Sequence, residues 1–311
     1  MLGRMANNVY WMARYVERAE NMARLLASTY HMSLLPASDH NSVRHWNTPI
    51  DLSGGRADFD ERYEEVSPAT VIAYTLLDTA NPDSIRNNVR RARENARATR
   101  QDLTTEVWES LNQFYIELDS FSYAKLVDQG FQEEFDWVKE RSHLFRGAIY
   151  GTMRRGEAFR FCRMGTFIER ADNTARLLAV KWTLLSPNGT KPLAAEDYYR
   201  WGSLLRAFSA FKAYREVYSG IIEPRKVAEL LILRPDMPRS LTACAGEVAG
   251  ILKELRHDAA CTVLAEQIHA HARNSRIDSV LRSGIRRYLR DFVSRNNELH
   301  VSLGHEFMLT Q

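Results

Sequence analysis

The sequence feature that most constrains the fold is a stretch of twelve residues that occurs twice, at residues 15–26 and at residues 167–178. Eight of its positions are identical in the two copies. The polar residues that both copies share are Glu17/Glu169, Arg18/Arg170, Asn21/Asn173 and Arg24/Arg176. A repeat with such a long period predicts two related halves rather than a solenoid of short repeats.

A second pair of matching segments follows in the same order. Residues 71–85 align with residues 227–241, and the register continues to Arg100/Arg256 and Asp102/Asp258. We therefore expect one all-α domain over residues 1–311, a pseudo-twofold helical bundle with internal halves at about 1–150 and 157–311. In such a bundle each half can bury its apolar face on the other.

The hydrophobic pattern is helical along most of the chain. Glycine (15 residues) and proline (9 residues) are scarce, and strand-like alternation is hard to find. We expect a first helix over residues 8–34, a polar loop over residues 37–57 and a last helix over residues 277–303. Ser84 is expected to cap the N-terminus of a further long helix. The apolar stripe of the first helix comprises Val9, Met12, Val16, Ala19, Ala23 and Leu26.

The overall composition excludes several classes of protein. A net charge of +3 is too small to indicate nucleic-acid binding. No apolar run approaches the ~20 residues that a membrane span needs. The three cysteines, Cys162, Cys244 and Cys261, lack metal-ligand spacing and favour a reducing compartment. We expect a cytoplasmic protein with neither nucleic acid nor membrane as partner, and the first residues lack a secretory apolar core.

The repeated stretch at residues 167–178, together with residues 92–97, 207–215 and 234–241, resembles the bacterial alpha-E family, which is named for its Glu-Arg motif. The likeness extends from Met1 to about Leu299. It implies a helical domain without an established activity or catalytic residues. It also implies companions among ATP-grasp ligases, transglutaminase-like proteins and N-terminal-nucleophile hydrolases, in systems that make or modify peptides.

The shared polar residues of the repeat lie on one helical face. Glu17, Asn21 and Arg24 are spaced i, i+4 and i+7. One interpretation is a solvated face with pairs such as Glu20 with Arg24. The agreement between two diverged copies favours a buried or half-buried face instead.

Burial of both copies leads to a specific hypothesis, in which the two helices meet. Glu17 is then expected to pair with Arg170 or Arg176, and Glu169 with Arg18 or Arg24. Two glutamates and four arginines carry an excess positive charge, which suits a phosphate or carboxylate ligand. The alternative is a buried salt-bridge network that only fixes how the halves dock.

An arginine stripe follows Ser84 and comprises Arg86, Arg90, Arg93, Arg97 and Arg100. Its stems can simply cover apolar surface at the edge of a buried face. The functional alternative is a contact with an acidic partner protein, in which Arg93 and Arg97 are our candidate ligand-binding residues.

A pattern typical of di-iron bundles is also present. Glu140 with His143, and Glu266 with His269, have the i, i+3 spacing of metal-ligand pairs, and Glu17 and Glu169 complete the ferritin-like order. Neighbouring arginines would repel a cation, so we expect no metal. Cys162 is a candidate nucleophile, although a lone cysteine in a helix is more often part of the core. Phosphate-binding and dinucleotide-binding glycine motifs are absent, so no cofactor is expected.

We expect an accessory or binding protein, not an enzyme, that takes an anionic ligand or partner through its arginines and glutamates. A partnership with an ATP-grasp-type ligase is what the family resemblance implies. The alternative is an enzyme that uses Glu17 and Glu169 in acid–base or di-metal chemistry. Arginines beside a carboxylate favour its ionised form, which disfavours a general acid at neutral pH.

Overall fold

The computed structural model describes residues 3–34, 42–122, 131–185, 195–256 and 258–307. Every regular element within these residues is a helix. The chain divides into two compact units. The N-terminal unit comprises residues 8–162, and the C-terminal unit comprises residues 163–311 together with residues 1–7. The division falls inside one continuous helix, α9 (Glu157–Leu185).

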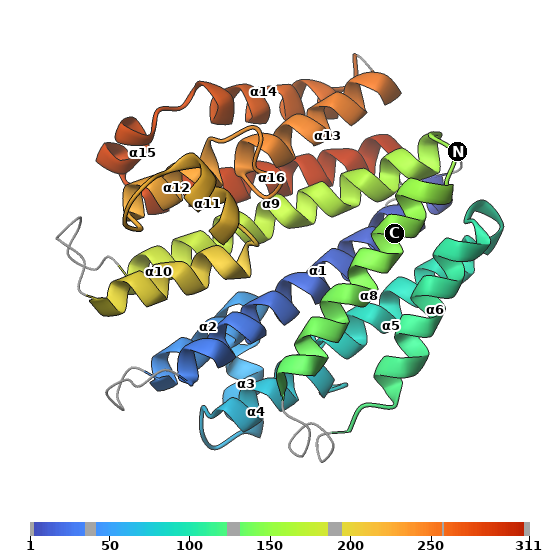
Figure 1. The fold of residues 1–311 in the computed structure, drawn as a ribbon. Coiled ribbons are helices and arrows are strands. Elements are labelled where there is room, and N and C mark those ends of the chain that lie inside the picture. Colours follow the sequence, from blue (N-terminus) through green and yellow to red (C-terminus); the bar gives the residue numbers. More distant parts are fainter. Residues whose placement is uncertain (1–2, 35–41, 123–130, 186–194, 257, 308–311) are drawn as a thin grey trace. The chain divides into compact units, whose positions relative to one another are not determined.

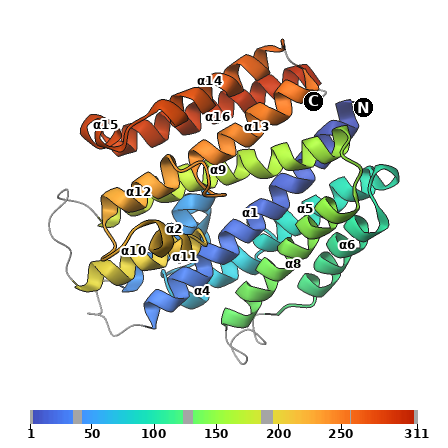
Figure 2. The ribbon, with the colours of Figure 1, turned by 45° about the horizontal axis from the view of Figure 1, so that its top comes forward.

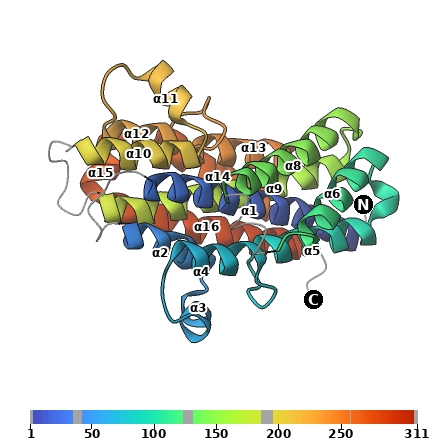
Figure 3. The ribbon, with the colours of Figure 1, turned by 60° about the horizontal axis from the view of Figure 1, so that its bottom comes forward.

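Four long helices form the body of the N-terminal unit. They are α1 (Gly3–Ser33), α5 (Ile85–Ala98), α6 (Thr105–Asp119) and α8 (Phe131–Thr152). Helix α5 packs on α6, and α6 packs on α8 (Figure 1). Short elements connect α1 to α5: α2 (Ser42–Ser53), α3 (Arg56–Arg62), α4 (Pro68–Ile72) and the π-helix η1 (Ala73–Leu77). Helix α3 lies at the edge of this unit, beyond α4 (Figure 3). A 3₁₀ turn, η2 (Arg100–Asp102), follows α5.

The C-terminal unit continues from α9 through α10 (Ala195–Ala207), α11 (Phe211–Val217) and α12 (Pro224–Ile232). Its remaining helices are α13 (Leu241–Leu255), α14 (Ala260–Asn274), α15 (Ile277–Ser283) and α16 (Ile285–Phe307). Helix α13 packs on α14, and α14 packs on α16. Helix α15 connects α14 to α16 at one end of this pair (Figure 2).

The sequence repeat is also visible in the local structure of each unit. Ser84 accepts a hydrogen bond from the backbone N–H of Asn87 and caps α5. Ser240, which lies 156 residues later, caps α13 in the same way through Ala243. Both units also pack three helices in series after this cap, α5–α6–α8 and α13–α14–α16. A pseudo-twofold relation between the halves stays a prediction.

The predicted apolar stripe of α1 is confirmed. All six of its side chains are buried, from Val9 to Leu26. They are spaced alternately three and four residues apart, so that one side of the helix can enter the core. The helix itself is slightly longer at its start than the expected range and begins at Gly3.

The polar loop expected over residues 37–57 is wrong for most of its length, because α2 occupies residues 42–53. Trp46 and Ile50 are one turn apart on α2 and are 1% and 0% exposed. Burial of these two large side chains stabilises a helix that contains Pro49 and that the polar composition concealed. Residues 37–41 lie outside the described residues.

The last helix, expected as one element over residues 277–303, is interrupted. Gly284 has a φ of +95°, a backbone conformation that residues with a Cβ rarely adopt. It separates α15 from α16 and therefore lets the chain change direction between them.

Candidate functional site

The first copy of the motif takes part in an ion cluster between α1 and α8. We call Glu17, Glu20, Arg24, His143 and Arg146 the α1 ion cluster. Glu17 and Glu20 are 1% and 0% exposed. Arg146 Nη1 of α8 lies 3.2 Å from Glu17 Oε2 and also pairs with Glu20 Oε2. One guanidinium therefore contacts both buried acids of α1.

Arg24 approaches the same carboxylate from within α1. Its Nε donates to Glu20 Oε1 over 2.7 Å, and its Nη2 lies 2.9 Å from His143 Nε2. The same His143 nitrogen lies 3.5 Å from Glu20 Oε1, so His143 is close to both partners of this ion pair. The side chain of His143 is 54% exposed and marks the outer edge of the cluster.

Acids of the chain accompany the arginines of the first copy. Arg18 pairs with Asp83 over 2.9 Å. Three carboxylates, of Glu17, Glu20 and Asp83, thus accompany Arg18, Arg24 and Arg146 in this part of the unit. The sequence hypothesis counted two glutamates and four arginines over both copies, and its excess of positive charge stays a prediction.

The second copy has a buried glutamate and an i, i+4 ion pair at the positions that correspond to those of the first copy. Glu169 and Arg170 are 5% and 9% exposed, and Arg176 donates to Asp172 over 2.7 Å. This i, i+4 pair corresponds to that of Arg24 with Glu20. Asn173 is half-buried, and its counterpart Asn21 in the first copy is buried. The expected pairing of one copy with the other stays a prediction.

Around the second copy, uncharged hydrogen bonds fix α9 to its neighbours in the C-terminal unit. Thr174 Oγ1 donates to the carbonyl oxygen of Arg239 over 3.0 Å, just before α13. Asn296 Nδ2 of α16 donates to the carbonyl oxygen of Ile168 over 3.2 Å. Both side chains are buried, so these hydrogen bonds replace the hydrogen bonds to water that the polar groups lose on folding.

The arginine stripe of α5 has mixed roles. Arg86 donates to the backbone carbonyl oxygens of Leu118 and Phe121, at the C-terminus of α6. It therefore satisfies carbonyl groups that the helix end leaves without intrahelical partners. This member of the stripe stabilises the fold.

Of the two stripe residues proposed for ligand binding, Arg93 is engaged and Arg97 is exposed. Arg93 Nε donates to Asn112 over 3.0 Å, and its guanidinium lies 4.8 Å from the centre of the Tyr115 ring. The Arg97 side chain is 67% exposed and shares Glu94 with Arg93. Arg97 is thus the more accessible of the two.

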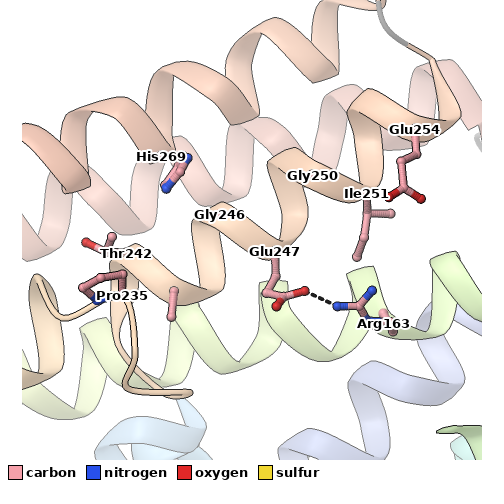
Figure 4. Close-up of a pocket in the computed structure, with 10 residues that line it drawn as sticks. Arg163, Pro235, Thr242, Gly246, Glu247, Gly250, Ile251, Glu254 and His269 are labelled. Carbon is pink, nitrogen blue, oxygen red and sulfur yellow. Dashed lines mark hydrogen bonds and ion pairs between the residues drawn. The ribbon is translucent and has the colours of Figure 1, made fainter.

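A pocket of about 350 Å³ opens in the C-terminal unit between α13 and α14 (Figure 4). Arg163 of α9 and Glu247 of α13 form an ion pair across its edge, and His269 enters from α14. Burial and nearby Arg273 lower the pKa of His269, so its imidazole is neutral at neutral pH. The pocket therefore presents an ion pair and a neutral imidazole to a polar ligand.

Two glycines of α13 shape the floor of this pocket. A Cβ at Gly246 would lie 3.0 Å from His269 Nε2, whereas a Cβ at Gly250 would meet no atom within 4 Å. Sequence reasoning missed this pocket because Arg163 and Glu247 are 84 residues apart. In the sequence, Gly246 and Gly250 are spaced i and i+4, and this pair of small residues could have indicated a flat helix face.

A comparison with known protein families gives a match over residues 1–308, to Alpha-E, described as a predicted alpha-helical domain with a conserved ER motif. The chain belongs to the Alpha-E family. Each copy of its repeated stretch contains a Glu-Arg pair, and the all-α fold agrees with the family description. The chain matches no curated protein and no solved structure.

The residues of the metal pattern in this Alpha-E chain are exposed or have other partners within their own unit. Glu140 is exposed, and His143 bonds Arg24 instead. Glu266 is exposed and lies 4.0 Å from Lys253. Among the described residues, no three His, Cys, Asp or Glu side chains are grouped so as to hold a metal ion.

Cys162 is unsuited to nucleophilic chemistry. It is 1% exposed, and burial raises the pKa of its thiol to about 12. A thiol with this pKa is protonated at neutral pH, and only the thiolate is a strong nucleophile. The interpretation of Cys162 as a core residue is the one that its burial favours.

A dense group of arginines near the C-terminus was also not predicted as a candidate site from the sequence. Arg276, Arg282, Arg286, Arg287 and Arg290 are all exposed and belong to α15, α16 and the residue before α15. Counting charges in short windows would have revealed it. None of the described helices of this Alpha-E protein is long and apolar enough to cross a membrane.

Proposed function

We propose that this Alpha-E chain is a non-catalytic accessory protein that binds a partner in a bacterial system for peptide synthesis or modification. The partner we propose is an ATP-grasp-type ligase, and this choice rests on the family resemblance. The observation that supports a non-catalytic role is the environment of Glu20, a fully buried carboxylate shared by Arg24 and Arg146.

Two guanidinium groups on one carboxylate favour its ionised form strongly. An ionised carboxylate has no proton to donate as a general acid, and a base needs an oxygen that a substrate can reach. Both oxygens of Glu20 have an arginine partner, and Glu17 shares Arg146. The first copy of the motif therefore supports a structural role, in which α1 is held on α8.

The same contacts bear on anion binding. Arg18 and Arg24 already pair with carboxylates of the chain, and Arg176 pairs with Asp172. A phosphate or carboxylate ligand at these arginines would have to displace an internal acid. We propose that partner recognition instead uses arginines on the surface, among which Arg97 is well exposed.

The direct test is complex formation. The purified chain and an ATP-grasp-type ligase from a bacterium that encodes both are mixed, and size-exclusion chromatography with light scattering measures the mass. We expect a complex with a defined mass ratio. Separate elution of the two proteins at micromolar concentrations would overturn the proposed partnership.

A second measurement addresses the enzyme alternative. The isolated chain is incubated with ATP and amino acids, and release of phosphate is followed. We expect no turnover above that of a heat-denatured sample. Turnover by the isolated chain that Glu17→Gln abolishes would establish the enzyme and contradict the accessory role.

A further inference from the structure

The surface around α15 carries a concentrated positive charge. We call Arg276, Arg282, Arg286, Arg287 and Arg290 the arginine face. All five side chains are exposed, and they lie within fifteen consecutive residues of the C-terminal unit. Helix α15 contacts α16, so the two helices that carry four of these arginines are neighbours in the C-terminal unit.

Internal acids neutralise little of this charge. Asp278 is held by Arg225 over 3.0 Å, and Asp291 lies 3.9 Å from Arg287. The pKa of Asp278 is lowered first by its hydrogen bond with Arg225 and further by Arg282 and Arg276.

Among the described residues, Arg276, Arg282, Arg286 and Arg290 form no direct ion pair, although Arg276 and Arg282 lie near enough to Asp278 to lower its pKa. Arg286 and Arg290 are one helical turn apart, a spacing at which like charges repel each other. The repulsion is unfavourable in the free chain and would be relieved by a bound anion. The charge of the arginine face therefore favours binding of a negatively charged partner.

We propose that the arginine face is a docking surface for an acidic segment of a partner protein. The inference rests on the proposed function and assigns it a surface. Each guanidinium can bind a carboxylate through two parallel hydrogen bonds, and arginine is enriched at protein interfaces for this reason.

Two observations favour a polypeptide over other polyanions. Surfaces that bind single-stranded nucleic acid combine cations with aromatic rings on which bases stack. Here the ring of Tyr288 is already stacked on His271, with 5.3 Å between ring centres, and its hydroxyl bonds Ser275. No large hydrophobic side chain is exposed between residues 276 and 295, so the described surface offers no apolar anchor for a lipid bilayer.

The test uses a fluorescent ten-residue peptide of alternating glutamate and glycine, with binding followed by anisotropy. We expect Arg286→Glu/Arg290→Glu to weaken binding by about tenfold or more, because two attractive contacts become repulsive. The matched control is Lys212→Glu/Arg215→Glu on α11. These residues are exposed, belong to the same unit and undergo the same change in charge. We expect the control to stay within about threefold of the wild type.

Circular dichroism checks that both double variants fold, and the milder Arg286→Gln/Arg290→Gln replaces the charge reversal if that variant does not. An equal loss of affinity in the control would overturn the proposal, since it would reflect net charge alone. Tighter binding of duplex DNA, or of vesicles containing phosphatidylglycerol, than of the peptide at the same salt concentration would also overturn it.

Repeating the complex-formation experiment with the Arg286→Glu/Arg290→Glu variant separates the two proposals. Loss of the ligase complex in this variant alone supports both. A ligase that binds this variant as well as the wild type preserves the proposed function and overturns the arginine face as its docking surface. Face-dependent binding of the peptide without any ligase complex preserves the face and overturns the partnership.

Discussion

At the residue scale, the chain places ionisable groups in its interior in two different ways. Glu20 is buried with two guanidinium partners, which compensate the loss of its hydration. Lys181 of α9 is 9% exposed, and burial lowers the pKa of its amine to about 8. The first arrangement stabilises a charge, whereas the second makes a charge unfavourable.

Lys181 therefore predicts a pH-dependent stability. Between about pH 8 and pH 10.5 the unfolded chain binds more protons at this site than the folded chain, so stability rises with pH across this window. We expect Lys181→Met to raise the free energy of unfolding by roughly 3 kcal/mol at pH 7 and by much less near pH 10.5. Urea unfolding at both pH values measures the difference.

The control for this prediction is Lys212→Met, because that amine is 90% exposed. Its effect on unfolding should be small and independent of pH. An equal gain from Lys181→Met at pH 7 and pH 10.5 would show that hydrophobic contact, and not the charge, is responsible.

The residues of the motif and the intrahelical pair of Arg24 with Glu20 could be predicted from the sequence, but the partner on α8 could not. The repeat identified Glu17 and Arg24, and the intrahelical pair of Arg24 with Glu20 follows from its spacing. Arg146 is 129 residues from Glu17, so its contact depends on how α8 packs on α1. No periodicity within one helix contains that information.

At the element scale, the two halves start corresponding helices with the same cap. Both Ser84 and Ser240 are completely buried. We expect Ser84→Ala and Ser240→Ala each to lower the free energy of unfolding by about 1–2 kcal/mol, because a buried backbone N–H loses its acceptor. Urea denaturation of each variant measures the loss.

A serine at the opposite end of a helix provides the comparison. Ser120 is exposed and follows the last turn of α6, where its hydroxyl donates to a carbonyl oxygen. Ser120→Ala should change stability by less than about 0.5 kcal/mol. If the cap variants were as stable as this one, the repeated caps would have no energetic role.

Substitution of alanine for two glycines, one between helices and one within a helix, is expected to change stability in opposite directions. Gly284→Ala should lower stability by about 1–3 kcal/mol, because φ is +95° at this break. Gly147→Ala, within α8, should raise it by up to about 1 kcal/mol, because a Cβ there meets no atom within 4 Å. Thermal unfolding of both variants measures the signs, and a gain from Gly284→Ala would contradict the need for this backbone conformation.

The prediction of helices succeeded where the apolar pattern extended over many turns and failed where burial depended on tertiary packing. The stripe of α1 repeats over many turns, so its burial could be inferred. In α2 the hydrophobic side chains found buried are Trp46 and Ile50, and Pro49 argues against a helix. Their burial becomes visible only in the folded chain.

At the scale of the whole molecule, our account separates the groups that hold the fold from those that meet a partner. The α1 ion cluster lies in the N-terminal unit and is largely buried. The arginine face lies in the C-terminal unit and is exposed. The order of helices agrees with the tandem repeat, whereas the pairing of the two motif copies stays a prediction.

The central claim is that the buried acids of the first copy act as internal ion-pair partners, and a double-mutant cycle on Glu20 and Arg146 tests it most directly. Urea unfolding is measured for Glu20→Gln, Arg146→Met and the double variant, with Arg97→Met as the exposed control. We predict a loss of about 3 kcal/mol for each single variant and a clearly smaller loss than their sum for the double variant. Additive losses no larger than that of Arg97→Met would contradict the account.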